Sequence, residues 1–312
     1  MTRADPVFVY GALRSGTTVF RLMLDAHPGL SNCGEVDFLL DYLERDPTRP
    51  DGWRYRRQAM QDDRIFKAKA LDLDPALDGL ALFDAMIDQL ASRSPGLLTL
   101  NIHRHIDRLL EILPEVRLIH LLRDPRDVAR SSIGMGWAGT LYHGVDHWMK
   151  TEAAWDRVAP QLDPAQVCTL RYEDLFRNVD HELARVCEFL GVAPDPAMLR
   201  YHENTTYEPP DPALVEQWRR KSTPAEIALV EGKARALMTA RGYEPTGPGT
   251  TPGPLQALRL WIANKRAIWR TGIERYGAGL WLAAKVSHRL RLTRLHRRLR
   301  ARIDEKALRY LK

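Results

Sequence analysis

Short apolar runs alternate with helical patterns along the first 245 residues of the chain. The runs are short and rich in branched or aromatic residues, which predicts strands at 7–11 (VFVYG), 97–103 (LLTLNIH), 116–122 (VRLIHLL) and 166–172 (QVCTLRY). Apolar residues at helical spacing predict helices at 17–27, 105–113 and 182–192. This alternation predicts an α/β fold with a P-loop-like central parallel sheet flanked by helices on both faces. In such folds, ligands bind beyond the carboxyl ends of the strands.

The pattern changes at PTGPGTTPGP (245–254), where four prolines, three glycines and three threonines exclude a helix or strand interior. We therefore predict an α/β domain over 1–244, a linker over 245–254 and a separate tail over 255–312. Within the tail, apolar residues recur at helical spacing among arginines and lysines. They predict a C-terminal basic helical extension of two helices, broken near 276–279. Residues 45–96 and 193–225 are expected to form the lid or acceptor side.

Charge is distributed unevenly along the chain. Of the net charge of +6, the tail carries 16 basic and three acidic residues, a local net of +13, and the remaining 254 residues carry a net of −7. A basic amphipathic tail is typical of helices that lie on an anionic membrane surface. It is equally compatible with a homodimer contact, with binding of an acidic glycan, or with a packed helical hairpin whose basic face is solvated. Nucleic acid is not an expected partner, because the basic run lacks a known docking motif.

Other features exclude several classes of protein. Three widely spaced cysteines suggest neither a disulfide framework nor a zinc site, and we expect no metal. We also expect no secretory signal peptide. The apolar stretch at 277–284 is far shorter than the roughly 20 residues that a bilayer span requires. These features favour a cytoplasmic protein, with peripheral attachment at the inner membrane surface as the role of the tail.

Candidate chemistry begins in GALRSGTT (11–18), between the first strand and the first helix. Two glycines five positions apart allow a tight loop whose N–H groups converge at a helix N-terminus, which favours phosphate-like oxyanions. Thr17 stands where the phosphate loop of nucleotide triphosphatases has lysine, which counts against ATP or GTP hydrolysis. Arg14 supplies a guanidinium suited to phosphate or sulfate oxygens. The alternative is an ordinary strand-to-helix turn with a solvated arginine.

A second candidate lies in RDPRDVARSS (123–132), where another predicted strand passes into a helix capped by Asp124 or Asp127. Arg123 and Ser131 can share a phosphate through charge and hydroxyl donation. Taken alone, this segment also fits a surface salt-bridge cluster. Two anion sites at adjacent strand ends indicate a nucleotide with phosphates at both ends.

These motifs resemble those of the sulfotransferases that use 3′-phosphoadenosine-5′-phosphosulfate (PAPS). YGALRSGTT is similar to their 5′-phosphosulfate loop, RDPRDVARS to their 3′-phosphate motif, and RYEDL (171–175) to a third shared element. The stretch 15–35 is especially similar to tyrosylprotein sulfotransferases and to related bacterial and carbohydrate enzymes. The resemblance covers roughly residues 7–245 and leaves the tail outside.

The resemblance implies PAPS as the cofactor and a role for individual residues. Arg14 would stabilise the transferring sulfuryl group and the leaving phosphate, while Thr17 and Thr18 would hold the 5′-phosphate. The full set of implied cofactor-binding residues is Arg14, Ser15, Gly16, Thr17, Thr18, Arg123, Ser131 and Tyr172, with Arg219 and Lys221 in a late basic segment expected over the nucleotide. The family implies no essential metal.

The resemblance leaves two candidates for the general base. Glu35 matches the glutamate of the tyrosylprotein enzymes, although Val36 replaces the second glutamate that they tend to have. His103 falls where the cytosolic small-molecule enzymes have the last residue of a Lys-Thr-His motif. Asn101 replaces the lysine of that motif, so Arg14, Lys67 or Lys69 would have to supply its charge. A solvated acid at 35 and a structural histidine at 103 are the alternatives.

We therefore expect a sulfotransferase that moves a sulfuryl group from PAPS to a hydroxyl on a glycan, a lipid, a peptide tyrosine or a secondary metabolite. Sulfuryl transfer needs in-line positioning, charge neutralisation and a base, and the two loops and the base candidates match those needs. The alternatives are a P-loop small-molecule kinase and a non-catalytic module that binds a membrane surface.

Overall fold

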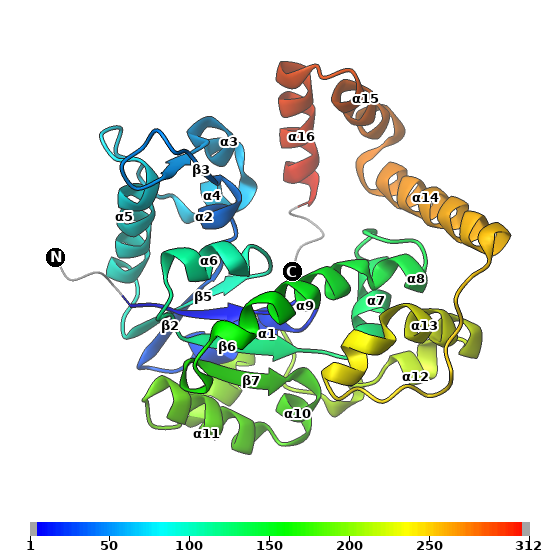
Figure 1. Ribbon diagram of the computed structural model, residues 1–312, viewed down its shortest axis with the longest axis horizontal. Helices are drawn as coiled ribbons and strands as arrows, with labels where there is room; N and C mark the ends of the chain where they lie inside the picture. The colour runs from blue at the N-terminus through cyan, green and yellow to red at the C-terminus, as the bar shows by residue number, and fades with distance from the viewer. Residues whose placement is uncertain (1–4, 308–312) are drawn as a thin grey trace.

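The computed structural model describes residues 5–307, and its centre is a parallel five-stranded sheet in the order β2-β5-β1-β6-β7 (Figure 1). The strands are β1 (Val7–Tyr10), β2 (Leu30–Glu35), β5 (Leu97–Ile102), β6 (Leu118–Leu122) and β7 (Val167–Arg171). A small antiparallel pair, β3 (Leu43–Arg45) and β4 (Trp53–Tyr55), lies outside this sheet. The predicted α/β class and the four predicted strands are confirmed. The edge strand β2 and the β3–β4 pair were not predicted.

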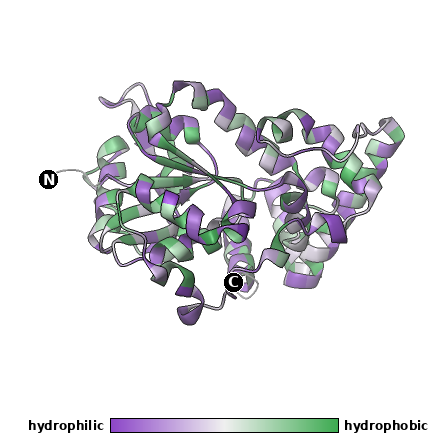
Figure 2. Ribbon diagram, turned by 90° about the horizontal axis from the view of Figure 1, so that it is seen from below, coloured by the Kyte–Doolittle hydropathy of each residue, from purple (hydrophilic) through white to green (hydrophobic). Residues whose placement is uncertain are grey.

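Helices cover both faces of the sheet, because side chains alternate between the faces along each strand. Phe8 and Tyr10 of β1 join one core, while Val7 and Val9 join the other. The helices of the body are α1 (Thr17–Asp25), α2 (Phe38–Asp41), α3 (Arg57–Asp62), α4 (Arg64–Lys69), α5 (Gly79–Ser92), α6 (Ile106–Ile112), α7 (Pro125–Gly134), α8 (Leu141–Gly144), α9 (Asp146–Val158), α10 (Tyr172–Arg177), α11 (Val179–Leu190), α12 (Trp218–Lys221) and α13 (Pro224–Ala240). In Figure 2 the strands are mostly hydrophobic and the surrounding helices are mixed.

Local signals set the ends of several helices. The Asp124 carboxylate accepts from the backbone N–H of Arg126 and caps α7, and Pro125 occupies its first turn. Gly191, with φ of 75°, ends α11 in the left-handed region. The strand predicted over 166–172 ends at Arg171, because Tyr172 already begins α10.

Up to residue 307, the C-terminal extension contains three helices rather than the predicted two. They are α14 (Pro254–Tyr276), α15 (Ala278–Arg289) and α16 (Thr293–Ala307). The first break falls at Gly277, as predicted, and a second falls at residues 290–292. Arg291 has φ of 54° there, so a left-handed residue turns the chain where no glycine gives a signal. No helix within residues 5–307 is long and apolar enough to cross a bilayer.

The extension is docked on the body on the side of α3 and α8 (Figure 1). Asn264 of α14 accepts from the Gly139 backbone over 2.6 Å, and Arg275 donates to the carbonyls of Gly134 and Met135, each over 2.7 Å. Arg297 of α16 forms an ion pair with Asp62 of α3 at 2.8 Å. The tail therefore touches the body at two separate places.

Candidate active site at the carboxyl end of the sheet

The loop between β1 and α1 turns through two left-handed residues. Arg14 has φ of 73° and Gly16 has φ of 93°. Glycine is needed at position 16, because a Cβ there would lie 2.2 Å from the ring of Tyr172. A Cβ at Gly11 would lie 2.5 Å from the Leu121 carbonyl oxygen, so the loop also leaves the sheet where β1 and β6 are in close contact. The predicted tight loop is present.

Hydroxyl side chains and backbone N–H groups gather where this loop enters α1. Ser15 is fully buried, and its Oγ has no hydrogen-bond partner within residues 5–307. Thr17 is buried and Thr18 is half-buried, and the first turn of α1 contains no acidic residue. A helix N-terminus without a carboxylate favours an anion, and a buried unpaired hydroxyl has a hydrogen bond to give to it.

The loop is in direct contact with α7 and with Arg123, which lies just before that helix. Arg14 Nε donates to Ser131 Oγ over 2.9 Å. Arg123 donates to the Arg14 carbonyl over 3.2 Å, and its guanidinium lies 4.0 Å from the centre of the Tyr172 ring. Burial, and next the charge of Arg123, lower the pKa of Arg14, because two guanidinium groups face one region. The structure thus brings both predicted anion motifs and Tyr172 together.

A cavity of about 380 Å³ lies beside these residues. It is lined by Arg123, Asp127, Arg130, Ser131, Ile133, Gly134, Gln217 and Lys221. Three cations face one carboxylate, and the buried Nε of Arg123 has no hydrogen-bond partner among the described residues. These features fit a phosphate group, whose oxygens would satisfy the orphaned donor. Lys221 therefore lies with the predicted 3′-phosphate motif.

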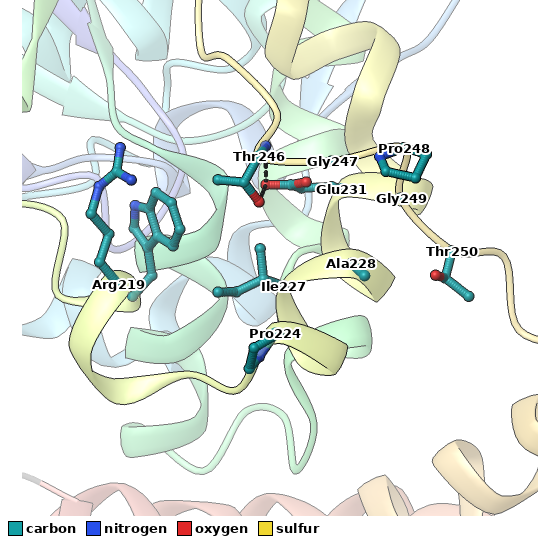
Figure 3. A pocket seen from close by; sticks show the side chains of 11 residues that line it. Arg219, Pro224, Ile227, Ala228, Glu231, Thr246, Gly247, Pro248, Gly249 and Thr250 are labelled. Atoms are coloured by element: carbon teal, nitrogen blue, oxygen red, sulfur yellow. Dashed lines mark hydrogen bonds between the residues drawn. The ribbon is translucent and has the colours of Figure 1, made fainter.

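Arg219 lies apart from that cavity, although it is only two positions from Lys221. Its guanidinium stacks 4.3 Å from the ring centre of Trp218 and pairs with Glu216 at 3.1 Å. It borders another cavity, of about 440 Å³, between α12, α13 and residues 246–250 (Figure 3). There Glu231 accepts hydrogen bonds from the backbone and hydroxyl of Thr246. The structure does not bring Arg219 to the anion loops.

The two candidate bases are neighbours. Glu35 ends β2 and pairs in register with Asn101 of β5, so His103 follows on the adjacent strand. Glu35 Oε1 and His103 Nε2 are 3.6 Å apart. His103 is 3% exposed, and its Nδ1 donates to the Gly11 carbonyl over 2.8 Å, because a carbonyl can only accept. Its backbone N–H donates to Asp37. The sequence offered these two residues as alternatives, and the structure makes them a pair.

Their interaction sets their protonation. The interaction with His103 lowers the pKa of Glu35 against the opposing effect of burial. Burial acts to lower the pKa of His103, but the interaction with Glu35 and the charge of Asp37 outweigh it and raise the pKa. The Glu35 side chain is 39% exposed, whereas the His103 side chain is almost fully enclosed. Glu35 is thus the partner that an incoming molecule can reach.

Asn101 does not point into the anion site. It is buried, its amide donates to the Thr17 carbonyl over 3.3 Å, and its oxygen accepts from Asn32 over 3.1 Å. It therefore ties the start of α1 to β5 and β2. Lys69 donates to the Cys33 carbonyl, and burial lowers its pKa, while Lys67 is exposed on α4. Of these two lysines, Lys69 is the one the structure places beside the base.

Sequence reasoning missed His147 of α9. Its Nε2 donates to the Leu13 carbonyl over 2.9 Å, and burial lowers its pKa. This hydrogen bond ties the anion loop to α9. His147 stands in a stretch, 136–155, that is first glycine-rich and then aromatic, and no sequence motif there marks it. Residues 5–307 contain no group of histidine, cysteine, aspartate and glutamate side chains suited to a metal ion.

Comparisons with known proteins agree with this geometry. A family model described as the sulfotransferase family matches residues 6–196. An uncharacterized protein of Aquifex aeolicus is 25% identical over 233 residues, which are 69% of this chain and 29% of that protein, so the chain corresponds to under a third of that relative. A protein of Caenorhabditis briggsae, provisionally named a protein-tyrosine sulfotransferase, is 26% identical over 63% of this chain and 69% of its own length.

The fold has relatives of known structure. The sulfotransferase domain from the curacin biosynthetic pathway superposes with a TM-score of 0.54 at 19% identity, covering 77% of this chain and 98% of that domain. At this identity the likeness establishes the shared fold. Because the family match spans more than half of the chain and contains both anion motifs, the chain belongs to the sulfotransferase family, whose members transfer sulfuryl groups.

Proposed function

We propose that this protein transfers a sulfuryl group from PAPS to a hydroxyl-bearing acceptor. The observation that carries the proposal is the contact between Arg14 and Ser131, because it joins the two predicted anion motifs in one site. When bound, PAPS supplies the activated sulfuryl group and a stable leaving phosphate. The chain supplies positioning, charge and a base, which are the main contributions to such transfers.

Each part of the site has a distinct task in this proposal. The loop from Gly11 to Thr18 holds the 5′ end of the nucleotide through backbone N–H groups and hydroxyls. Arg123, Ser131 and Lys221 hold the 3′-phosphate. Tyr172 lies between them, with one face on Gly16 and the Arg123 guanidinium over its ring, and stands beside the nucleoside.

Glu35 is the base in this proposal, and His103 is a positioning residue. Glu35 is partly exposed and ionised, so it can accept the hydroxyl proton of the acceptor. His103 is held by the Gly11 carbonyl and Asp37 and presents Nε2 to the carboxylate. Because Gly11 also starts the anion loop, one histidine connects the base to the donor side.

A binding assay and a turnover assay test the function. We expect adenosine 3′,5′-bisphosphate to bind to the full-length protein, and PAPS to be converted to that product when a panel of phenols, glycans and hydroxylated lipids is supplied. ATP with magnesium serves as the comparison, since a small-molecule kinase would turn over ATP instead. Failure of the bisphosphate to bind would reject the donor assignment.

We also propose that the protein is cytoplasmic and attaches to an anionic membrane surface through residues 255–307. Many large apolar side chains of this segment are exposed among its cations: Leu255, Leu258, Trp261, Ile262, Trp269, Ile273, Leu282, Val286, Leu290, Leu292 and Leu295. Exposed apolar residues with surrounding arginines are typical of helices at a lipid interface. In this proposal, residues 1–244 form the α/β domain, and residues 245–254 link that domain to the membrane-bound tail.

Vesicle sedimentation tests this attachment. The full chain should sediment with vesicles containing phosphatidylglycerol, should remain in solution with pure phosphatidylcholine, and should be released by salt. Trp261→Asp combined with Trp269→Asp should abolish binding, while Leu214→Asp, at an exposed apolar position outside the tail, should not. Equal binding by the double variant, or a homodimer in place of vesicle binding, would reject the proposal.

A further inference from the structure

A third cavity, of about 250 Å³, lies between the C-terminal helices and the body. The body contributes Arg64 of α4 and Trp137 from the loop after α7, and the tail contributes Ile268, Trp281 and Arg300. Figure 1 shows α16 descending between α3 and α14, and the Arg297–Asp62 ion pair fixes it against α3. The tail therefore builds one whole side of this cavity.

This cavity and the proposed donor cavity share the end of α7. The donor cavity is lined by Ile133 and Gly134, and the tail cavity by the next residues, Met135 and Gly136. Trp137 borders the tail cavity and its ring lies 6.1 Å from the His147 ring, edge to face. His147 in turn donates to the loop that contains Arg14. One layer of side chains thus separates the tail cavity from the anion loop.

A helix of the body that borders the cavity also contacts the strand that carries the proposed base. Arg64 opens α4, and its charge contributes to the lowered pKa of Glu35. Lys69, at the other end of the same helix, donates to the Cys33 carbonyl, two positions before Glu35. The helix α4 therefore joins the edge of the tail cavity to the strand that carries the base, and Trp137 with His147 joins the cavity to the loop that contains Arg14.

The lining of the cavity has a definite chemistry. Arg64 forms no hydrogen bond or ion pair with another residue in the range 5–307, whereas Arg300 is paired with Asp304 at 3.3 Å. Trp281 stacks on Tyr276 with ring centres 5.8 Å apart, and its buried Nε1 has no partner among the described residues. An aromatic wall, one uncommitted guanidinium and one unpaired indole N–H match a flat apolar molecule with an oxyanion.

The position of Trp281 depends on a glycine. A Cβ at Gly272 of α14 would lie 2.3 Å from the indole ring, so only glycine lets α14 approach Trp281 this closely. The aromatic wall is thus built by contact between α14 and α15. It exists only because the tail folds back on itself.

We propose that α14, α15 and α16 wall the acceptor site, and that this site selects a hydroxyl compound with an apolar ring body and an anionic group. The inference rests on the proposed sulfotransferase function and names the acceptor class for it. The anionic group pairs with Arg64, the ring lies against Trp281, and the hydroxyl faces Glu35. The tail thereby acts as a specificity element, in addition to any contact with a membrane.

Calorimetry on the full-length protein saturated with adenosine 3′,5′-bisphosphate tests this assignment without turnover. The probes are 6-hydroxy-2-naphthoate and its neutral counterpart, 2-naphthol. We expect the naphthoate to bind about tenfold more tightly, which corresponds to about 1.4 kcal/mol for one ion pair in a partly enclosed site. Arg64→Gln should remove this preference, and Arg64→Lys should retain part of it.

The ring contact has its own variant and a matched control. Gly272→Ala should displace Trp281 and weaken both probes, while affinity for the bisphosphate stays unchanged. Gly279→Ala, at a position with open space around it, should affect neither. If the naphthoate fails to bind, or binds Arg64→Gln as tightly as the natural protein, the assignment is wrong. Loss of bisphosphate binding in the natural protein would instead reject the proposed function.

Discussion

Arg14 and Ser131 are 117 positions apart in the chain, yet Arg14 Nε donates to Ser131 Oγ over 2.9 Å. One residue belongs to the loop after β1 and the other to α7, which follows β6. The register of β1 against β6 makes this contact possible, because the two strands end side by side. A nucleotide with a phosphate group at each end can therefore be held by two neighbouring loops.

Removing the guanidinium at position 123 should weaken nucleotide binding. We expect Arg123→Ala to lower affinity for adenosine 3′,5′-bisphosphate about 30-fold to 150-fold, since a charge-assisted hydrogen bond to phosphate is worth roughly 2–3 kcal/mol. Ser131→Ala should have a smaller effect, because it removes one neutral hydroxyl. Calorimetric titration measures both constants. Arg157→Ala, an exposed arginine that bonds within α9, is the control, and equal affinities in all variants would contradict the 3′-phosphate assignment.

Two substitutions separate the roles of Glu35 and His103. Glu35→Gln should reduce kcat by roughly 10²–10⁴, the usual contribution of a general base, with unchanged bisphosphate affinity. His103 is the main cause of the lowered pKa of Glu35, so His103→Asn should let that pKa rise. Because Glu35 acts in its ionised form, the acidic limb of the kcat profile should then move to higher pH. A profile that keeps its acidic limb in place would show that His103 does not set the state of Glu35.

Glycine at position 16 is required by the ring of Tyr172. Gly16→Ala should destabilise the protein by about 2–4 kcal/mol, because the new methyl group meets the ring at 2.2 Å and the backbone is left-handed. Urea unfolding measures this change, and bisphosphate affinity should fall with it. Gly279→Ala in α15 has nothing within 4 Å of its Cβ and should be neutral or slightly stabilising. Equal stability of the two variants would contradict the contact.

Stability should fall between pH 5 and pH 8 because of Glu173. Burial raises its pKa to about 7, and its two oxygens accept from the Asp124 backbone and the Tyr243 hydroxyl. A carboxyl whose folded pKa exceeds its unfolded value stabilises the fold at low pH, and this contribution is lost as pH rises through the folded pKa. The contribution is about 3 kcal/mol at roughly 1.4 kcal/mol per pKa unit.

Glu173→Gln should remove that contribution. The difference in unfolding free energy between the natural protein and this variant should shrink by about 2–3 kcal/mol from pH 5 to pH 8, as measured by urea denaturation at both pH values. Glu188→Gln, at an exposed carboxylate of α11, should show the same pH dependence as the natural protein. A constant difference for Glu173→Gln would mean that this carboxyl titrates normally.

Local signals in the sequence were sufficient for much of the fold. The apolar runs located β1, β5, β6 and β7, and the cap at Asp124 located α7. The edge strand β2 was missed because LSNCGE is polar. Asn32 within it is buried by hydrogen bonds to Thr99 and Asn101, and such pairing is invisible before the neighbouring strand is known. The third tail helix was missed because its boundary is a left-handed arginine.

The site was predictable in composition but not in arrangement. The sequence identified Arg14, Arg123 and Ser131 as anion ligands, but not the hydrogen bond between two of them. The sequence presented Glu35 and His103 as alternatives. The pairing of β2 with β5 brings them together, and β2 is the strand that the sequence did not predict. Arg219 and Lys221 looked equivalent, yet α12 is only four residues long, and its turn directs the two side chains to different cavities.

The hydrogen bonds from Arg275 to the carbonyls of Gly134 and Met135 have a practical consequence. Those carbonyls lie at the C-terminus of α7, where the last carbonyls of a helix have no partner within the helix itself. The tail therefore supplies the hydrogen-bond donors that cap α7. Removing the tail at the proline-rich segment would leave the end of α7 uncapped, about one turn beyond Ser131, and would expose more of Trp137. We therefore expect a shortened protein made for crystallisation to bind the nucleotide with lower affinity than the whole chain.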